Sequence, residues 1–164
     1  MLACAGWGRY TAAPVGTHER LGLTSIVALG AAFVLAACGG EDRLSREEFQ
    51  KQGNAICAKY DKQIDAVATP SSIEEVSGYV DKVVPLVEKE ISEMKALKPP
   101  EEDQESFDRM IAKGEETKEA GEELGAAAEK RDEAAVQRAL QKGQAAGNES
   151  DRLAGELGLD DCQG

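Results

Sequence analysis

Apolar residues between positions 45 and 157 recur at spacings of three and four, which place them on one face of an α-helix. No stretch alternates apolar and polar residues with the period of two that a half-buried strand requires, so we expect no β-sheet. Turn residues and prolines divide the pattern into four helices, which we expect over 45–67, 72–97, 103–129 and 132–157. The sequence therefore predicts an all-α protein, an antiparallel four-helix bundle with up-down-up-down connections.

Two of the expected helices begin with a capping pattern. Ser45 and Glu48 have the spacing of a capping box, and Ser72 with Glu75 repeats it. Pro85 lies inside the second helix, where it cannot donate a backbone N–H, and this predicts a kink. The alternative is a break into two shorter helices.

Small residues occupy the inner positions of the last two helices. An antiparallel hairpin that turns near Arg131 would place Gly121 opposite Gly143 and Gly114 opposite Ser150. Small residues that face each other let two helix axes approach toward about 8 Å, so we expect close packing between these helices. The alternative is that the glycines only weaken the helices, since each costs about 1 kcal/mol relative to alanine.

The segment before the bundle contains an uncharged apolar run, residues 21–37, preceded by Arg20 and followed by Cys38. The run is short for a helix that spans a bilayer core, which needs about 20 residues. It suits the apolar region of a signal peptide better, and the alternative is an uncleaved membrane anchor. Either interpretation places the rest of the chain outside the cytoplasmic membrane.

The residues Leu35-Ala36-Ala37-Cys38 resemble the lipobox of bacterial lipoproteins, in which two small residues precede the cysteine that takes the lipid. The resemblance implies a signal peptide over 1–37, cleavage before Cys38, and a lipid on the Cys38 thiol with acyl chains such as palmitate. Residues 38–44 would then form a short tether and residues 45–164 the bundle. We accordingly expect a protein held at the cell membrane by the lipid on Cys38, on the extracytoplasmic face.

The part of the chain after Cys38 also resembles a group of short helical lipoproteins of high-GC Gram-positive bacteria. The resemblance lies in Leu44-Ser45-Arg46-Glu47-Glu48-Phe49, Ala55-Ile56-Cys57, Leu97-Lys98-Pro99-Pro100 and Leu157-Gly158-Leu159 before Cys162. As a group, these proteins have no assigned activity. The resemblance therefore implies a location and a shape, and it assigns no functional residues.

Two cysteines remain in the bundle, Cys57 and Cys162, in a compartment where thiols oxidise. We expect a disulfide between them. The alternatives are two free thiols or a redox-active pair, although a redox pair usually has Cys-x-x-Cys spacing. The bond would close a loop of more than 100 residues, and it would stabilise the fold by up to about 4.7 kcal/mol in the chain-entropy model.

The charge of the chain excludes one class of partner. Its 19 basic and 31 acidic residues give a formal net charge of -12. Removal of residues 1–37 takes away two basic residues and one acidic residue, which leaves 17 basic and 30 acidic. Binding to nucleic acid requires a basic face, so we expect no nucleic-acid partner.

The residue types in the bundle also argue against catalysis. The one histidine, His18, lies in the segment expected to be removed, which excludes a histidine-containing triad and a His-ligated haem. Runs of carboxylates at 101–105 and 115–123 are typical of solvated helix faces, and the alternative is weak Ca²⁺ binding. We therefore expect no catalytic residue, no metal site and no cofactor, and we expect that the protein is not an enzyme.

Two roles remain. The first is a non-catalytic module that binds or scaffolds a protein of the cell envelope, and the alternative is a carrier that binds a small ligand between the helices. A docking module should show an exposed apolar patch on a helix face. A carrier should show an apolar pocket, and an enzyme should show buried carboxylates with raised pKa values.

Overall fold

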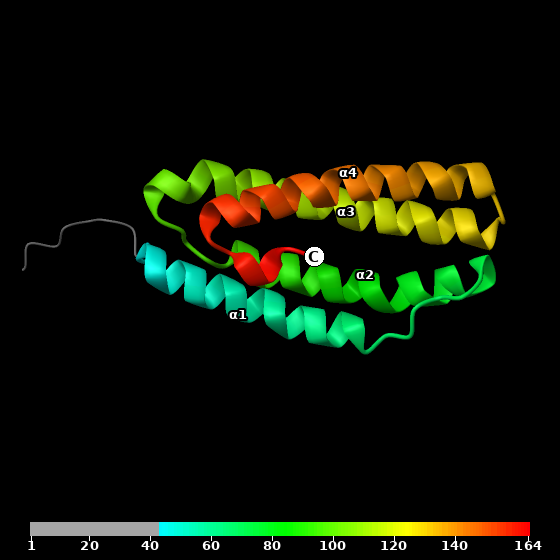
Figure 1. Cartoon of the computed structure of the whole chain (residues 1–164), viewed down its shortest axis with the longest axis horizontal. Helices are drawn as coiled ribbons and strands as arrows, with labels where there is room; N and C mark the ends of the chain where they lie inside the picture. Colours follow the sequence, from blue (N-terminus) through cyan, green and yellow to red (C-terminus); the bar gives the residue numbers. More distant parts are fainter. Residues whose placement is uncertain (1–42) are drawn as a thin grey trace, which may run out of the picture. The chain divides into compact units, whose positions relative to one another are not determined.

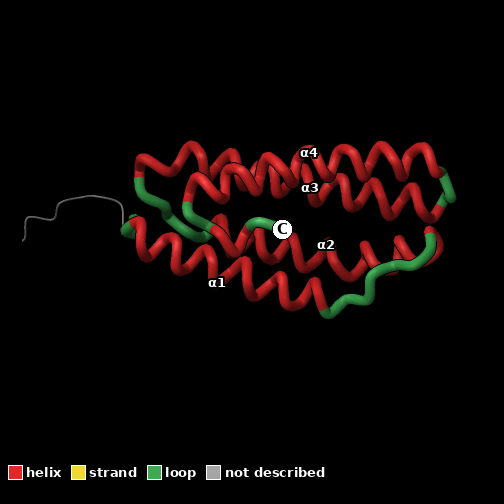
Figure 2. The backbone as a smooth tube through the Cα atoms, viewed as in Figure 1, coloured by secondary structure: helices red, strands yellow, loops and turns green. Residues whose placement is uncertain are grey.

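The structure is a computed structural model that describes residues 43–164, and this part of the chain folds into four long helices (Figure 1). They are α1 (Arg46–Asp65), α2 (Ile73–Lys95), α3 (Gln104–Glu129) and α4 (Glu133–Leu157), with short 3₁₀ helices η1 (Glu101–Asp103) before α3 and η2 (Asp160–Cys162) after α4. Figure 2 shows helices and loops and no strand in the described residues. The expected helical bundle is confirmed, and each helix begins and ends within two residues of its expected bounds.

The helix starts agree with the expected capping at α1 and differ from it at α2. The Ser45 hydroxyl accepts a hydrogen bond from the Glu48 N–H, and the Glu48 carboxylate accepts one from the Ser45 N–H at 3.2 Å. The side chain of Ser72 makes no capping hydrogen bond. Glu75 instead accepts from the N–H of Ser71 at 2.8 Å and from its hydroxyl at 2.9 Å, because Ser71 offers two donors to one carboxylate oxygen.

Successive helices run in opposite directions, so that α2 packs against α1 and α3, and α3 packs against α4 (Figure 1). The contact between α1 and α4 is made mainly through η2, which touches both. Helix α2 continues through Pro85 without interruption, which excludes the break into two helices. The kink at Pro85 stays a prediction.

The large buried side chains gather where α1 and α3 begin and α2 and α4 end. Phe49 and Phe107 meet edge to face there, with ring centroids 5.3 Å apart. Leu153, Leu157 and Leu159 are almost completely buried in the same cluster. The hydrophobic core therefore lies toward one end of the bundle.

The chain enters the bundle at that same end. The Leu44 N–H donates to the carbonyl of Lys98 at 2.9 Å. Nη1 of Arg43 donates to the carbonyl of Pro99 at 3.0 Å and to Oε1 of Gln104 at 2.7 Å. These bonds hold the segment before α1 against the connection between α2 and α3.

The three glycines of α3 face α2, whereas the sequence predicted that two of them, Gly114 and Gly121, face α4. A Cβ built on each would have its nearest neighbour in a branched residue of α2: Ile91 at 3.6 Å for Gly114, Val84 at 3.4 Å for Gly121 and Val80 at 3.0 Å for Gly125. Side chains that branch at Cβ are stiff and broad close to the backbone. A glycine opposite each of them lets α2 and α3 approach closely.

Both α3 and α4 contain several buried alanine residues, and one of them lies at the contact between the two helices. Gly143 lies opposite Ala120, whose Cβ would be 3.5 Å from a Cβ at position 143. The buried alanines of the two helices are Ala120, Ala127 and Ala128 on α3 and Ala139, Ala146 and Ala154 on α4. The expected pairings of Gly121 with Gly143 and of Gly114 with Ser150 are wrong, because α3 has two faces of small residues and its glycines belong to the face that meets α2.

Candidate functional site

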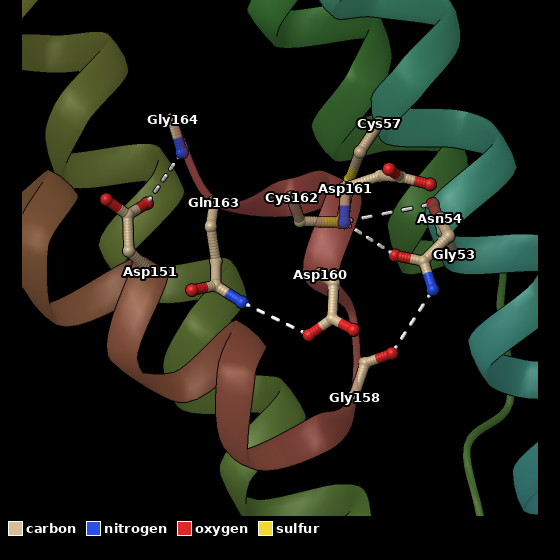
Figure 3. Close-up of a disulfide and its surroundings, with 10 residues drawn as sticks. All are labelled: Gly53, Asn54, Cys57, Asp151, Gly158, Asp160, Asp161, Cys162, Gln163 and Gly164. Carbon is tan, nitrogen blue, oxygen red and sulfur yellow. Dashed lines mark hydrogen bonds between the residues drawn. A yellow bond between two sulfur atoms is a disulfide. The ribbon is translucent and has the colours of Figure 1, made fainter.

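A disulfide joins Cys57 of α1 to Cys162 of η2 (Figure 3). The Cα atoms of the two residues lie 5.1 Å apart, although 105 positions separate them in the sequence. The expected pairing is thereby confirmed. Cys38 lies outside the described residues, so its lipid and the cleavage before it stay predictions.

Gly158 redirects the chain after α4, so that the C-terminal tail (residues 158–164) can reach α1. Its φ of 73° lies in the left-handed region, and the Leu159 N–H donates to the Ala154 carbonyl at 2.9 Å, as in a Schellman motif. A side chain at position 158 would overlap the amide group of Gln50. Gly158 therefore ends α4 after Leu157, the last residue of the range expected for this helix, and Leu159 folds back into the core.

One face of α1 receives the tail. It consists of Gln50, Gly53, Asn54 and Cys57, which recur at helical spacing and are called the clasp below. Gly53 leaves room for the buried side chain of Leu159, because a Cβ at position 53 would lie 2.5 Å from Leu159 Cδ2. A larger residue at position 53 would force the Leu159 side chain to move.

Two amide side chains of the clasp bond to the backbone of the tail and of the end of α4. Nε2 of Gln50 donates to the carbonyl of Leu157 at 3.0 Å. Nδ2 of Asn54 donates to the carbonyl of Gly158 at 3.1 Å, and Oδ1 of Asn54 accepts from the Asp161 N–H at 2.8 Å (Figure 3). Carbonyls at a helix C-terminus lack partners within the helix, so the clasp supplies donors that the end of α4 needs.

A half-open cavity of about 220 Å³ lies beside the disulfide and is called the interhelical cleft below. All four helices and the tail contribute to its lining, and the tail lies between α1 and α4 (Figure 1). Most of the lining surface is apolar and comes from Val87, Ile91 and Met94 of α2 and Met110 and Ile111 of α3. Gly114 of α3 and Gly147 of α4 also line the cleft and leave it wider than larger residues would.

Three carboxylates from three helices line the cleft: Asp61 of α1, Glu90 of α2 and Asp151 of α4. No lysine, arginine or histidine lines it. Oδ1 of Asp151 accepts a long hydrogen bond from the Gly164 N–H at 3.5 Å. The Glu90 side chain has no hydrogen bond and no ion pair with any residue in the part of the chain that the structure describes.

The surroundings of Glu90 disfavour its charged form. Burial is the larger cause and the negative charge of Asp61 the smaller, and together they raise the pKa of Glu90 to about 7. The pKa of Asp61 is also raised, first by burial and then by Asp65 and Asp161. Near neutral pH, Glu90 is therefore divided between its neutral and charged forms, and a cation in the cleft would favour the charged form.

Other carboxylates of the bundle have cationic partners on neighbouring helices. Glu93 of α2 pairs with Lys59 of α1 and also accepts a hydrogen bond from the Tyr60 hydroxyl at 2.7 Å. Nζ of Lys142 lies 2.8 Å from a carboxylate oxygen of Glu123. Glu90 differs from these residues because it is half-buried and its carboxylate has no cationic partner.

Asp103 departs from the solvated acidic run expected at 101–105, because it is buried. Its Oδ1 accepts from Nη2 of Arg46 at 2.7 Å, whereas its Oδ2 is buried without a hydrogen-bond partner. The ion pair links the start of α1 to the start of α3, away from the cleft.

Sequence reasoning did not single out Glu90 or the clasp, although signals for both are present. Glu90 stands three residues after Val87 and four before Met94, so it interrupts an apolar helix face with a charge. Gln50, Gly53 and Asn54 share a helix face with Cys57, which was assigned to a disulfide. Polar amides on the face of a bridging cysteine indicate a surface that receives another segment of the chain.

Within residues 43–164, no group of three His, Cys, Asp or Glu side chains is placed to hold a metal ion. No helix in this range is both long enough and apolar enough to cross a bilayer. No protein-family model, curated protein or solved structure matches the chain. A role for the cleft must therefore be inferred from its own geometry and chemistry.

Proposed function

We propose that the protein is a lipoprotein, held on the extracytoplasmic face of the cell membrane by a lipid on Cys38, whose helical bundle binds a small ligand in the interhelical cleft. The cleft is the observation that supports this role, since it combines an apolar lining with a half-buried carboxyl group, Glu90, that has no cationic partner. Small-molecule sites are mostly apolar, with a few polar groups that orient the ligand. The cleft, at about 220 Å³, suits a molecule smaller than the drug-sized ligands held by cavities of roughly 300–1,000 Å³.

Protein docking, the first role expected from the sequence, finds less support. A docking surface needs a contiguous exposed apolar patch. Among the described residues, Leu140 is the large hydrophobic side chain that is exposed, at 40%. One side chain does not make a patch, so we place ligand binding ahead of protein docking.

The proposed anchoring is supported by the lipobox resemblance at 35–38 and by the disulfide, which is typical of extracytoplasmic proteins. Arg43 is bonded to the connection between α2 and α3. The residues from Cys38 to Arg43 span about 17 Å when fully extended. The end of the bundle that contains the hydrophobic core would therefore lie close to the membrane surface.

Anchoring is tested by expressing the full chain in a bacterium that processes lipoproteins and supplying labelled palmitate. The wild type should be labelled, should fractionate with the membrane, and should have the mass of a chain that begins at Cys38. Cys38→Ser should lose the label, whereas the matched control Cys4→Ser should keep it. Equal labelling of Cys38→Ser and wild type would contradict the proposed anchor.

Ligand binding is tested by native mass spectrometry of the protein extracted from the producing cells. A Cβ on Gly147 would meet no atom within 4 Å, so Gly147→Leu can be accommodated and would fill part of the cleft. Gly78 is equally open but does not line the cleft, which makes Gly78→Leu the matched control. Wild type and Gly78→Leu should carry a small-molecule adduct that Gly147→Leu lacks. An adduct retained by Gly147→Leu, or absent from wild type, would contradict the role.

A further inference from the structure

We propose that the interhelical cleft selects a small organic cation, with an ammonium group against the Glu90 carboxylate and an apolar body against Ile91, Met94 and Met110. This inference rests on the proposed ligand-binding role and adds the chemical class of the ligand. It follows from three properties of the cleft: its charge, its apolar lining and the arrangement of its acidic groups.

The charge of the lining is of one sign. Besides Glu90, two acidic residues line the cleft: Asp61 of α1 and Asp151 of α4. Helix α3 contributes the uncharged residues Thr117 and Gly114. No cationic side chain lines the cleft, although the chain contains 19 lysine and arginine residues. An anionic ligand would be repelled by this lining, and a neutral ligand would bring no opposite charge to the Glu90 carboxylate.

The apolar part of the lining argues for an organic cation rather than a hydrated inorganic one. Ile91 and Met94 lie on α2, and Met110 lies on α3. All three line the cleft. Methionine side chains are flexible and adapt to the shape of an apolar ligand. An alkyl or aryl group would bury apolar surface there, which a metal ion cannot do.

The acidic residues are not arranged to share a metal ion. A hard divalent cation such as Ca²⁺ requires six to eight oxygen ligands around one point. No group of three His, Cys, Asp or Glu side chains among residues 43–164 has the required arrangement, although Asp61, Glu90 and Asp151 all line the cleft. One ammonium group needs only one carboxylate at contact distance, which Glu90 can supply, while Asp61 and Asp151 add a favourable potential.

Three probes have similar length and differ in charge: hexylammonium is a cation, 1-hexanol is neutral and hexanoate is an anion. Comparing their affinities separates the effect of ligand charge from the effect of ligand size. Binding is measured by equilibrium dialysis against the lipidated protein in zwitterionic liposomes, with empty liposomes to subtract partition into the bilayer. Wild type should bind hexylammonium saturably and at least tenfold more tightly than 1-hexanol, and it should not bind hexanoate. Glu90→Gln should weaken binding of hexylammonium at least tenfold and leave binding of 1-hexanol unchanged.

Glu88→Gln is the matched control, because Glu88 is an exposed carboxylate on the same helix that does not line the cleft. It should bind all three probes like the wild type. If 1-hexanol or hexanoate binds as tightly as hexylammonium, or if Glu90→Gln has no effect, cation selection is wrong while ligand binding in the cleft still holds. If none of the probes binds, the proposed ligand-binding role itself is contradicted.

Discussion

Glu90 stands out among the carboxylates of this protein because its neighbours on the helix face are apolar. Val87, Ile91 and Met94 all line the cleft beside it, and none of them can satisfy a charge. A carboxylate in such surroundings takes up a proton at a higher pH than in water. Its protonation therefore alters the stability of the fold even when no ligand is present.

The pH dependence of stability gives the first prediction, for Glu90→Gln. The folded protein holds a proton on Glu90 up to a pKa of about 7, whereas the unfolded chain releases it near the ordinary pKa of a glutamate, 4.5. The folded state binds more protons between these values, so the free energy of unfolding falls as pH rises through that range. We expect Glu90→Gln to match wild type near pH 4 and to be more stable at pH 8 by about 1–3 kcal/mol.

Urea unfolding at both pH values, followed by circular dichroism, checks this prediction. The control Glu88→Gln should match wild type at both pH values, because Glu88 is exposed and Glu90 is still present. A Glu90→Gln variant that is no more stable than wild type at pH 8 would show that Glu90 is not held in an unfavourable charged form.

Helices α2 and α3 pack with β-branched side chains of α2 against glycines of α3, and the space beside the glycine differs from one pair to the next. The distance from a built Cβ to its nearest α2 atom decreases from 3.6 Å at Gly114 to 3.0 Å at Gly125. Gly114 therefore has room for a methyl group in ordinary van der Waals contact. Gly125 does not, because the crowding atoms belong to Val80, which is stiff near its backbone and buried.

This gradient gives the second prediction. Gly114→Ala should stabilise the protein by about 0.5–1 kcal/mol through helix propensity alone. Gly125→Ala should lose that gain and be less stable than Gly114→Ala, because Val80 must move. Chemical denaturation of both variants measures the difference, and it should shrink when Val80 is also changed to alanine. Equal stability of the two alanine variants in the wild-type background would show that the helices do not meet as described.

The same interface shows what could be predicted from the sequence. Helix bounds, the disulfide and the stop at Gly158 followed from local signals: apolar spacing, caps, cysteine pairing and a C-terminal glycine. The helix that each glycine faces could not be predicted in this way, because Gly114 and Gly121 have the same heptad spacing whether they face α2 or α4. Glu90 and Asn54 were missed for a related reason, since their roles depend on segments that come close only in the folded chain.

In the molecule as a whole, α1 is held by α2 along one side and by the C-terminal tail along another. The clasp, the disulfide and the buried Leu159 act together at this second contact. The tail also contributes Cys162 and Gly164 to the lining of the cleft. The stability of the fold and the shape of the cleft consequently depend on the same contact.

The third prediction concerns the removal of the disulfide by Cys57→Ser together with Cys162→Ser. The bond closes a loop between positions 105 apart, so the variant should lose up to about 4.7 kcal/mol in free energy of unfolding. Urea unfolding of the wild type with a reducing agent should show a similar loss, and the double variant should not respond to the reducing agent. A wild type whose unfolding midpoint is unchanged by reduction would contradict a stabilising role for the bond.

The central claim is that the interhelical cleft is a ligand site. Hydrogen exchange of the backbone amides, measured with and without hexylammonium, shows which segments the probe protects and so tests this claim. Segments 87–94, 110–117 and 147–151 contain most of the residues that line the cleft. Their backbone amides should exchange more slowly when the probe is present in wild type, and the effect should disappear in Gly147→Leu. Unchanged exchange in all three segments, or slower exchange confined to a distant segment such as 73–80, would contradict the claim.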